Sequence, residues 1–68
     1  MENNTVPLTK REQEVLAALS QGYLYKEIAS RFSISLDTVK KHCKNIYQKL
    51  KVRNRTEATN YFNSRKAA

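Results

Sequence analysis

Glycine, proline and cysteine each occur once in this chain of 68 residues, and tryptophan does not occur. With so little glycine and proline and 40% hydrophobic residues, the composition favours a compact helical unit over a disordered tail or a turn-rich sheet. The lone Cys43 excludes an internal disulfide bond, and no hydrophobic run is long enough to span a membrane. The chain is predicted to form one small domain, which buries about 60% of the surface that its unfolded form exposes.

Acidic residues are scarce as well. Six of them against 13 lysines and arginines give a formal net charge of +7 and a pI of about 9.9. Such a charge on a small domain favours a polyanionic partner, either nucleic acid or an anionic membrane surface. The first residues, 1–7, lack the basic and apolar regions of a signal peptide, and a single cysteine fits a reducing compartment. We therefore expect a cytoplasmic protein.

The residue patterns that carry catalysis or bind metals are missing from the sequence. It has no paired carboxylates suited to a pocket, no nucleophile beside a base and no glycine-rich phosphate loop. His42 and Cys43 are adjacent but have no further ligand at metal spacing, so no zinc site is predicted. Cys43 is better explained as a small core residue and His42 as a helix-surface residue near phosphate. We predict that the protein is not an enzyme and needs no cofactor.

The sequence contains clear signals for two helices in its first half. Thr9 and Glu12 have the spacing of a capping box, which predicts a helix over about 10–21. Gly22 follows at the position where a helix commonly ends in the left-handed conformation. A second helix is predicted over 25–32, too short to be stable unless it packs against the first.

The second half predicts two more helices. A third is expected over 36–50, and because only 33–35 separate it from the second, the two must meet at a sharp angle, as in a helix-turn-helix. Asn54 and Glu57 give a capping signature for a fourth helix that ends near Asn63. The predicted fold class is all-α, a compact four-helix helix-turn-helix domain. Its predicted boundaries are a flexible lead-in or linker end at 1–7, the domain at 8–64 and a frayed tail at 65–68.

The third predicted helix has two chemically different faces. Ser35 can accept a hydrogen bond from the amide of Thr38 and so cap its start. Apolar residues recur along it at helical spacing and should be buried: Val39, Cys43, Ile46 and Leu50. Polar residues occupy the opposite face: Asp37, Lys40, Lys41, Lys44 and Gln48. Because residues 38–56 contain seven lysines and arginines and no acidic residue, this face should be a cationic stripe.

Several stretches together resemble the DNA-binding domain of LuxR-type (GerE-like) regulators, which includes the output domains of NarL/FixJ-like two-component response regulators. The stretches are LTKREQEVL at 8–16, Gly22, KEIA at 26–29, SLDTVKKH at 35–42, KLKV at 49–52 and RTEA at 55–58. The resemblance implies sequence-specific binding of duplex DNA as the output domain of a bacterial transcription regulator. It also implies that the third helix enters the major groove and that the domain usually follows a phosphorylatable receiver or another sensor domain.

The resemblance and the charge pattern give a set of DNA-contacting residues. Family base contacts carry over to Lys40, Lys41 and Lys44, and lysine can donate to the O6 and N7 atoms of guanine. Predicted phosphate contacts lie at helix ends and in the loop after the third helix: Lys26, Thr38, Lys49, Lys51, Arg53 and Arg55. Two of these assignments have alternatives. Arg55 can instead form an internal ion pair with Glu12 or Glu27, and Asp37 is better explained by the helix dipole than by contact with a cytosine amino group.

The chain departs from the family pattern in two places. Leu24 and Tyr25 stand where many relatives have Ser or Thr followed by Asn, so the side-chain cap of the second helix is missing. Leu24 is then free to pack inward, and Tyr25 is expected to cover the edge of the core rather than to contact the DNA backbone. Thr59 and Asn60 stand where relatives often have aliphatic residues that pair two protomers, which puts a homodimer through the fourth helix in doubt.

Two other classes of function compete with a LuxR-type output domain. A sigma-factor region-four-like module has a similar helix-turn-helix and also contacts RNA polymerase, but the RTEA stretch at 55–58 favours the LuxR type. A helical module that binds an acidic protein is disfavoured by the short turn at 33–35. The expected partner is double-stranded DNA, with a second protomer on DNA and RNA polymerase left open and no membrane contact.

Overall fold

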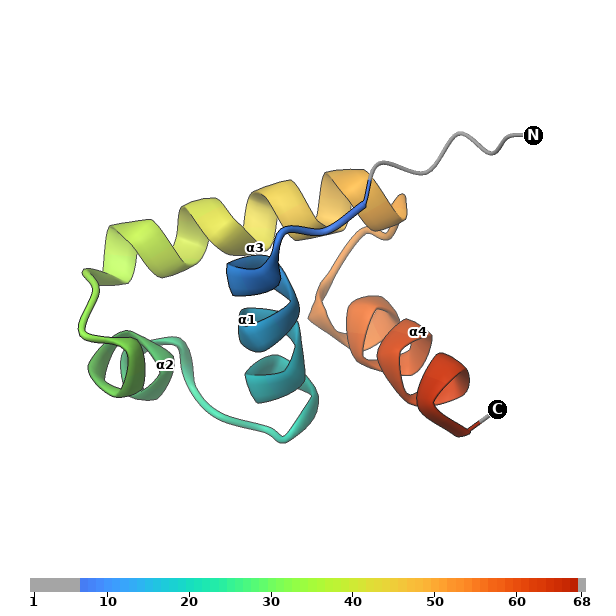
Figure 1. Cartoon of the computed structure of the whole chain (residues 1–68), viewed down its shortest axis with the longest axis horizontal. Helices are drawn as coiled ribbons and strands as arrows, with labels where there is room; N and C mark the ends of the chain where they lie inside the picture. Colours follow the sequence, from blue (N-terminus) through green and yellow to red (C-terminus); the bar gives the residue numbers. More distant parts are fainter. Residues whose placement is uncertain (1–6, 68) are drawn as a thin grey trace.

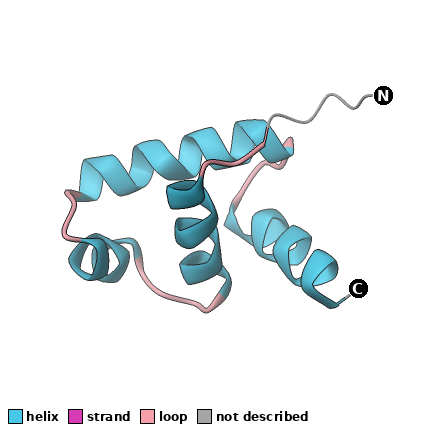
Figure 2. Ribbon diagram, in the orientation of Figure 1, coloured by secondary structure: helices cyan, strands magenta, loops and turns pink. Residues whose placement is uncertain are grey.

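The computed structural model of the protein describes residues 7–67, which form four helices and no strand (Figure 2). The helices are α1 (Lys10–Ser20), α2 (Tyr25–Phe32), α3 (Leu36–Leu50) and α4 (Arg55–Ala67). Figure 1 shows α3 running across the top, with α1 beneath its middle and α2 and α4 on either side. Both α1 and α3 contact all three other helices, so the domain is built around this pair. The predicted all-α, four-helix fold is confirmed. Residues 1–6 of the lead-in predicted at 1–7, and residue 68 of the predicted tail, lie outside the described residues.

Both ends of α1 follow from local sequence signals. The Thr9 side chain accepts a hydrogen bond from the Glu12 amide at 3.0 Å, and the Glu12 carboxylate accepts one from the Thr9 amide at 3.0 Å, which is the predicted capping box. The helix ends at Ser20, one residue before the predicted end, and Gln21 is its C-cap. Gly22 follows with a φ of +93°, as predicted for the left-handed residue at this helix end.

The start of α2 lacks a side-chain cap, as the sequence predicted. Leu24 occupies the cap position, and its amide donates to the Glu27 carboxylate at 2.7 Å, so Glu27 supplies half of a capping box. The expectation that Leu24 packs inward is wrong, because this residue is 53% exposed. Tyr25 is half-buried against the core, and its hydroxyl lies 3.2 Å from that of Tyr47 on α3. The prediction that Tyr25 covers the edge of the core is confirmed.

The turn between α2 and α3 is held by main-chain hydrogen bonds. Ser33 adopts a left-handed conformation with a φ of +56°, and its amide donates to the carbonyl oxygen of Ser30 at 3.3 Å. The Ile34 amide donates to the carbonyl oxygen of Ala29 at 3.0 Å, which completes a Schellman motif. Ser35 then caps α3 by accepting from the Thr38 amide at 3.1 Å. These bonds fix the sharp change of direction that defines the helix-turn-helix.

Replacing Ser35 with alanine should destabilise the domain by about 1 kcal/mol, because the Thr38 amide loses its side-chain acceptor. The measurement is the urea midpoint of unfolding followed by circular dichroism. Ser30→Ala is the matched control, since Ser30 is an exposed serine inside α2. An equal midpoint for Ser35→Ala and the parent would show that the hydroxyl does not stabilise α3.

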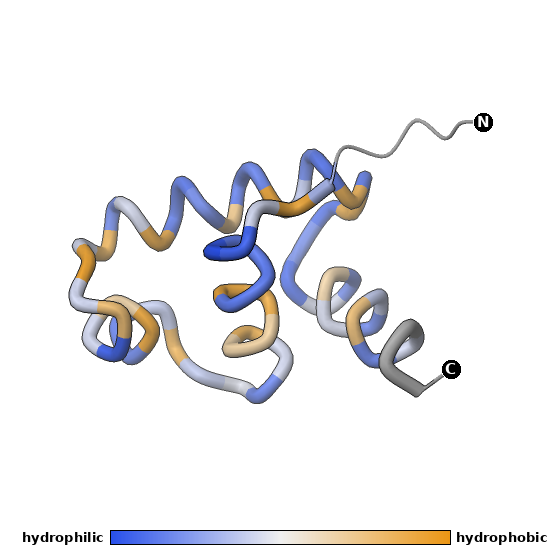
Figure 3. Tube along the Cα trace, viewed as in Figure 1, coloured by the Kyte–Doolittle hydropathy of each residue, from blue (hydrophilic) through white to orange (hydrophobic). Residues whose placement is uncertain are grey.

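The core lies where the apolar faces of the four helices meet. Its fully buried side chains come from all of them: Val15 and Leu19 on α1, Ile28 on α2, Val39 and Ile46 on α3, and Ala58 on α4. Cys43 is 2% exposed and therefore belongs to the core as predicted, whereas Leu50 is only partly buried. The remaining face of α3 points away from α1, and Figure 3 shows hydrophilic segments recurring along this outer side.

The fourth helix is longer than the sequence predicted. Its start is capped as expected, since the Asn54 side chain accepts from the Glu57 amide at 2.9 Å. The Glu57 carboxylate accepts from the Arg53 amide at 2.8 Å and so ties the preceding loop to the helix. The helix continues to Ala67 rather than ending near Asn63, because residues 64–67 include no glycine or proline that would break it.

Candidate nucleic-acid interface

Three lysines share the exposed side of α3. Lys40, Lys41 and Lys44 are all exposed, and each was predicted to contact bases. Since an α-helix turns by about 100° per residue, Lys41 and Lys44 lie opposite the buried Val39, Cys43 and Ile46 line. Lys40 lies on the flank that also carries Tyr47 and so is nearer to α2. The three lysines therefore lie on the exposed side of α3. No hydrogen bond or ion pair within the described residues holds their ammonium groups.

The first turn of α3 carries negative charge at its positive end. Asp37 is exposed in this turn, where a carboxylate is stabilised by the helix dipole. Thr38 is half-buried, and its hydroxyl lies 2.8 Å from that of Ser35. The Thr38 hydroxyl, which was predicted to contact phosphate, is thus part of a hydroxyl pair with Ser35 at the start of the helix.

Three of the predicted phosphate contacts present exposed cations. Lys26 lies in the first turn of α2, Lys51 directly follows α3, and Arg53 lies in the loop before α4. Lys51 has a left-handed backbone with a φ of +60°, and the Val52 amide closes the end of α3 by donating to the carbonyl oxygen of Tyr47 at 3.0 Å. This helix end directs the chain back toward α4 and leaves the side chain of Lys51 in solvent.

Lys49 has a partner inside the domain. Its ammonium group donates to the Glu12 carboxylate at 2.7 Å, and the exposed fractions of the two side chains are 23% and 6%. Burial raises the pKa of Glu12, but the bonds from Lys49 and from the Thr9 amide outweigh it, so the net pKa is lowered. The sequence assigned Lys49 to phosphate contact. In the structure its charge neutralises a buried carboxylate and joins α3 to α1.

Arg55 is also used internally, through backbone carbonyls. Its Nη2 atom donates to the carbonyl oxygen of Leu19 at 3.1 Å and to that of Tyr23, and the guanidinium lies 5.9 Å from the ring centroid of Tyr25. The suggested ion pair with Glu12 or Glu27 is wrong, because those carboxylates bind Lys49 and the Leu24 amide. Arg55 therefore joins α4 to the end of α1. The phosphate contacts assigned to Arg55 and Lys49 remain predictions.

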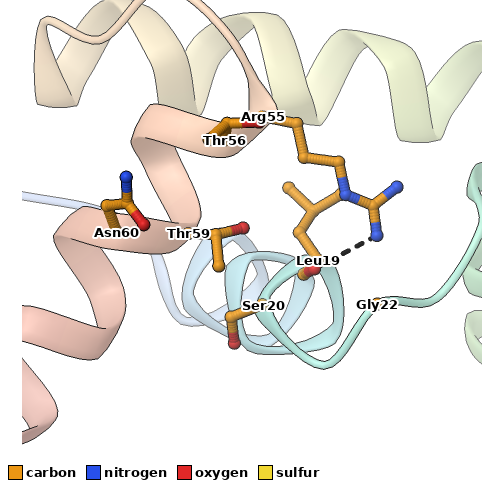
Figure 4. Close-up of a pocket in the computed structure, with 7 residues that line it drawn as sticks. All are labelled: Leu19, Ser20, Gly22, Arg55, Thr56, Thr59 and Asn60. Carbon is orange, nitrogen blue, oxygen red and sulfur yellow. Dashed lines mark hydrogen bonds between the residues drawn. The ribbon is translucent and has the colours of Figure 1, made fainter.

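The contact of Arg55 forms one wall of an open hollow of about 320 Å³ between α1 and α4. Figure 4 shows the guanidinium reaching across to Leu19, beside Gly22, while Thr56, Thr59 and Asn60 line the α4 side. Arg55 satisfies two carbonyl oxygens at and just after the end of α1, and hydrogen bonds to a charged donor contribute about 1.5–3 kcal/mol each.

Other groups have surroundings that suit structural roles. Burial raises the pKa of the Cys43 thiol, although the hydroxyls of Tyr25 and Tyr47 partly oppose this. The buried thiol is accordingly held in its neutral form. Within residues 7–67 no group of three or more His, Cys, Asp or Glu side chains gathers as metal ligands do. None of the described helices is both long and apolar enough to cross a membrane.

The contacts that sequence reasoning missed join residues far apart in the chain. The Lys49 to Glu12 pair and the Tyr25 to Tyr47 hydroxyl pair are separated by 37 and 22 positions. In the sequence, the only sign of the Lys49 to Glu12 pair was Glu12 at the third position of a helix. The role of Glu12 in the capping box already explained its presence there. A further unpredicted feature is the exposure of Leu36 at the start of α3, where 41% of the residue is accessible.

Comparison with known proteins agrees with this geometry. The family described as "Bacterial regulatory proteins, luxR family" matches residues 6–62. The chain is 55% identical over 51 residues to the probable transcriptional regulatory protein SgaR of Hyphomicrobium methylovorum. The aligned region covers 75% of this chain and 24% of SgaR. It is 48% identical over 54 residues to the response regulator protein VraR of Staphylococcus aureus, covering 79% of this chain and 26% of VraR.

A solved structure shows the same fold. The response regulator ChrA of a heme-sensing two-component system superposes with a TM-score of 0.84 at 36% identity, covering 97% of this chain and 33% of ChrA. The chain thus spans about a quarter of the length of the curated relatives and a third of ChrA. It belongs to the luxR family of bacterial regulatory proteins. Its four helices form the DNA-binding helix-turn-helix domain of that family.

Proposed function

We propose that this domain binds a specific duplex DNA sequence as the output domain of a cytoplasmic two-component response regulator, without catalytic activity. The observation that carries the proposal is the exposed side of α3, where Lys41 and Lys44 lie opposite the buried line and Lys40 lies on its flank. A major groove about 12 Å wide admits one helix, and its guanine edges offer acceptors to lysine. Two relatives of similar sequence or fold are named as response regulators, which supports the proposed context.

Exposed cations beside α3 complete the proposed interface. Lys26, Lys51 and Arg53 contact phosphates and position the domain, and Thr38 contributes a hydroxyl near the start of the recognition helix. Lys49 and Arg55 act indirectly, because they hold α3 and α4 against α1. The sigma-factor alternative is not favoured, since the matched relatives are a transcriptional regulator and response regulators.

The decisive substitution is Lys41→Ala. Lys41 lies one turn from the N-terminal end of α3, the end that contacts base edges in helix-turn-helix proteins. Its loss should cost about 1–3 kcal/mol on the preferred site and much less on scrambled DNA, so the ratio of the two affinities should shrink. The measurement compares a site selected from random DNA with a scrambled duplex at one salt concentration.

Arg53→Ala is the matched control for that comparison. Its side chain is exposed, and the hydrogen bond to Glu57 comes from its main-chain amide, so the variant should fold normally. It should weaken binding to both duplexes alike. If Lys41→Ala lowers both affinities equally, then Lys41 contacts phosphate and not bases.

The free domain should be monomeric at micromolar concentration and pair mainly on DNA. Asn60 and Asn63 on α4 are exposed, and Thr59 is half-buried beside α1, so these positions give a second protomer little apolar surface to cover. Sedimentation velocity with and without a two-half-site duplex measures this. A tight dimer without DNA would contradict the expectation.

Contact with RNA polymerase is a further part of the proposed function. Cross-linking of the domain to the polymerase on promoter DNA tests it.

A further inference from the structure

Leu36 is an exposed leucine at the N-terminal end of α3. The large hydrophobic residues that are strongly exposed in the described chain are Leu24, at 53%, and Leu36, at 41%. Ile34, two positions earlier, packs against the core, so the chain passes from buried to exposed within the turn. Leu36 is the first residue of α3, whereas Leu24 precedes α2.

Leu36 lies in line with two sets of residues on α3, one buried and one exposed. It precedes Val39 by three residues and thus extends the apolar line beyond the point where the other helices cover it. It also precedes the exposed Lys40 by four residues, which places these two side chains next to each other on the helix surface. Side chains on a helix tilt toward its N-terminus, so the leucine projects past the end of the helix.

We propose that Leu36 is a specificity-determining residue that packs against the C5-methyl group of a thymine. This inference rests on the proposed binding of α3 in the major groove. A leucine side chain has no hydrogen-bond donor or acceptor, and the thymine methyl is the apolar group that the four standard base pairs present in that groove. The first residues of the recognition helix are the ones that contact base edges in this motif.

The geometry also locates the thymine. One turn of α3 advances about 5.4 Å, and successive base pairs are about 3.4 Å apart. Leu36 therefore contacts a base pair one or two steps from the one that Lys40 contacts.

The test combines a protein substitution with the removal of one methyl group from the DNA. Sites are first selected from random DNA with the parent domain, and each thymine of the selected site is then replaced singly by deoxyuridine. At one position the parent should lose about fourfold in affinity, the amount expected for one buried methyl group. Leu36→Ala should lose affinity for the thymine site and should bind the thymine and deoxyuridine sites equally.

Leu24→Ala is the matched control, since it removes the other exposed leucine. It should keep the fourfold preference of the parent for the methyl group. If every deoxyuridine substitution affects the parent and Leu36→Ala alike, the proposed contact is wrong although the domain still binds its site. If no sequence is enriched in the selection, the proposed function itself fails, which is a different result. Circular dichroism of both variants verifies that each is folded.

Discussion

Affinity for duplex DNA is expected to fall about 500-fold when the salt concentration rises from 50 to 200 mM. The net charge of +7 supports strong attraction to DNA, and the six exposed cations of the interface, with the three lysines of α3 included, should together neutralise about five phosphates per protomer. Each contact releases condensed counterions, so log affinity should fall with log salt at a slope of about −4 to −5. Titration of a labelled duplex at several salt concentrations, followed by fluorescence anisotropy, gives the slope.

The same titration separates cations that contact DNA from those used inside the domain. Removing Lys26 and Arg53 together should reduce the slope by about two units, because both are exposed and lie beside α3. Lys10→Ala is the control, since Lys10 is an exposed lysine on α1 that the proposed interface does not include. Affinity that hardly changes with salt would overturn the proposed DNA interface.

Replacing Glu12 with alanine should destabilise the domain by about 2–4 kcal/mol. The substitution removes the acceptor for the Thr9 amide and leaves the ammonium of Lys49, whose side chain is 23% exposed, without its partner. Small domains have free energies of unfolding of only about 0.05–0.15 kcal/mol per residue, so this loss is a large share of the total. Urea unfolding of the parent and variant measures it.

A double variant tests whether the ion pair is the cause. Glu12→Leu with Lys49→Met replaces both charges by apolar groups of similar volume and should recover much of the lost stability. If the double variant is as unstable as Glu12→Ala, the lost hydrogen bond from the Thr9 amide, which neither variant can form, matters more than the unpaired ammonium. Glu14→Ala is the surface control, because its ion pair with Arg11 at 3.4 Å is exposed on both sides.

The Glu12 pair also predicts a dependence on pH. Because the folded-state pKa of Glu12 lies below its ordinary value of 4.5, the carboxylate contributes stability above that pH. The contribution is lost as the pH falls below 4.5 through the lower folded-state pKa. Glu12→Gln should therefore have a flatter acid limb than the parent in a plot of unfolding free energy against pH.

The elements that sequence reasoning placed correctly depend on signals only a few residues apart. Thr9 with Glu12, and Asn54 with Glu57, cap their helices as predicted, because a cap joins groups three positions apart. The burial of Cys43 also followed from local periodicity. The end of α4 was misplaced because no residue after Asn63 marks a stop, and helix ends without such signals are poorly defined.

The parts that could not be predicted depend on the tertiary structure. Lys49 and Arg55 look like surface cations in the sequence, but their partners are 37 and 36 residues away, and only the packing of α1 against α3 and α4 brings them together. Leu24 was expected to turn inward because it is apolar, but Glu27 satisfies its amide and the side chain stays in solvent. The set of DNA-contacting lysines on α3 remains a prediction for the binding experiments.

The turn before α3 depends more on the number of residues in it than on their side chains. Its bonds join main-chain groups of residues 29–34, and Ser33 takes the left-handed conformation without being glycine. Many substitutions there would preserve those bonds, whereas one inserted residue would rotate the following residues by about 100° relative to α2. Substitutions on the outer face of α3 can therefore change the preferred operator sequence without changing the orientation of the helix relative to α2.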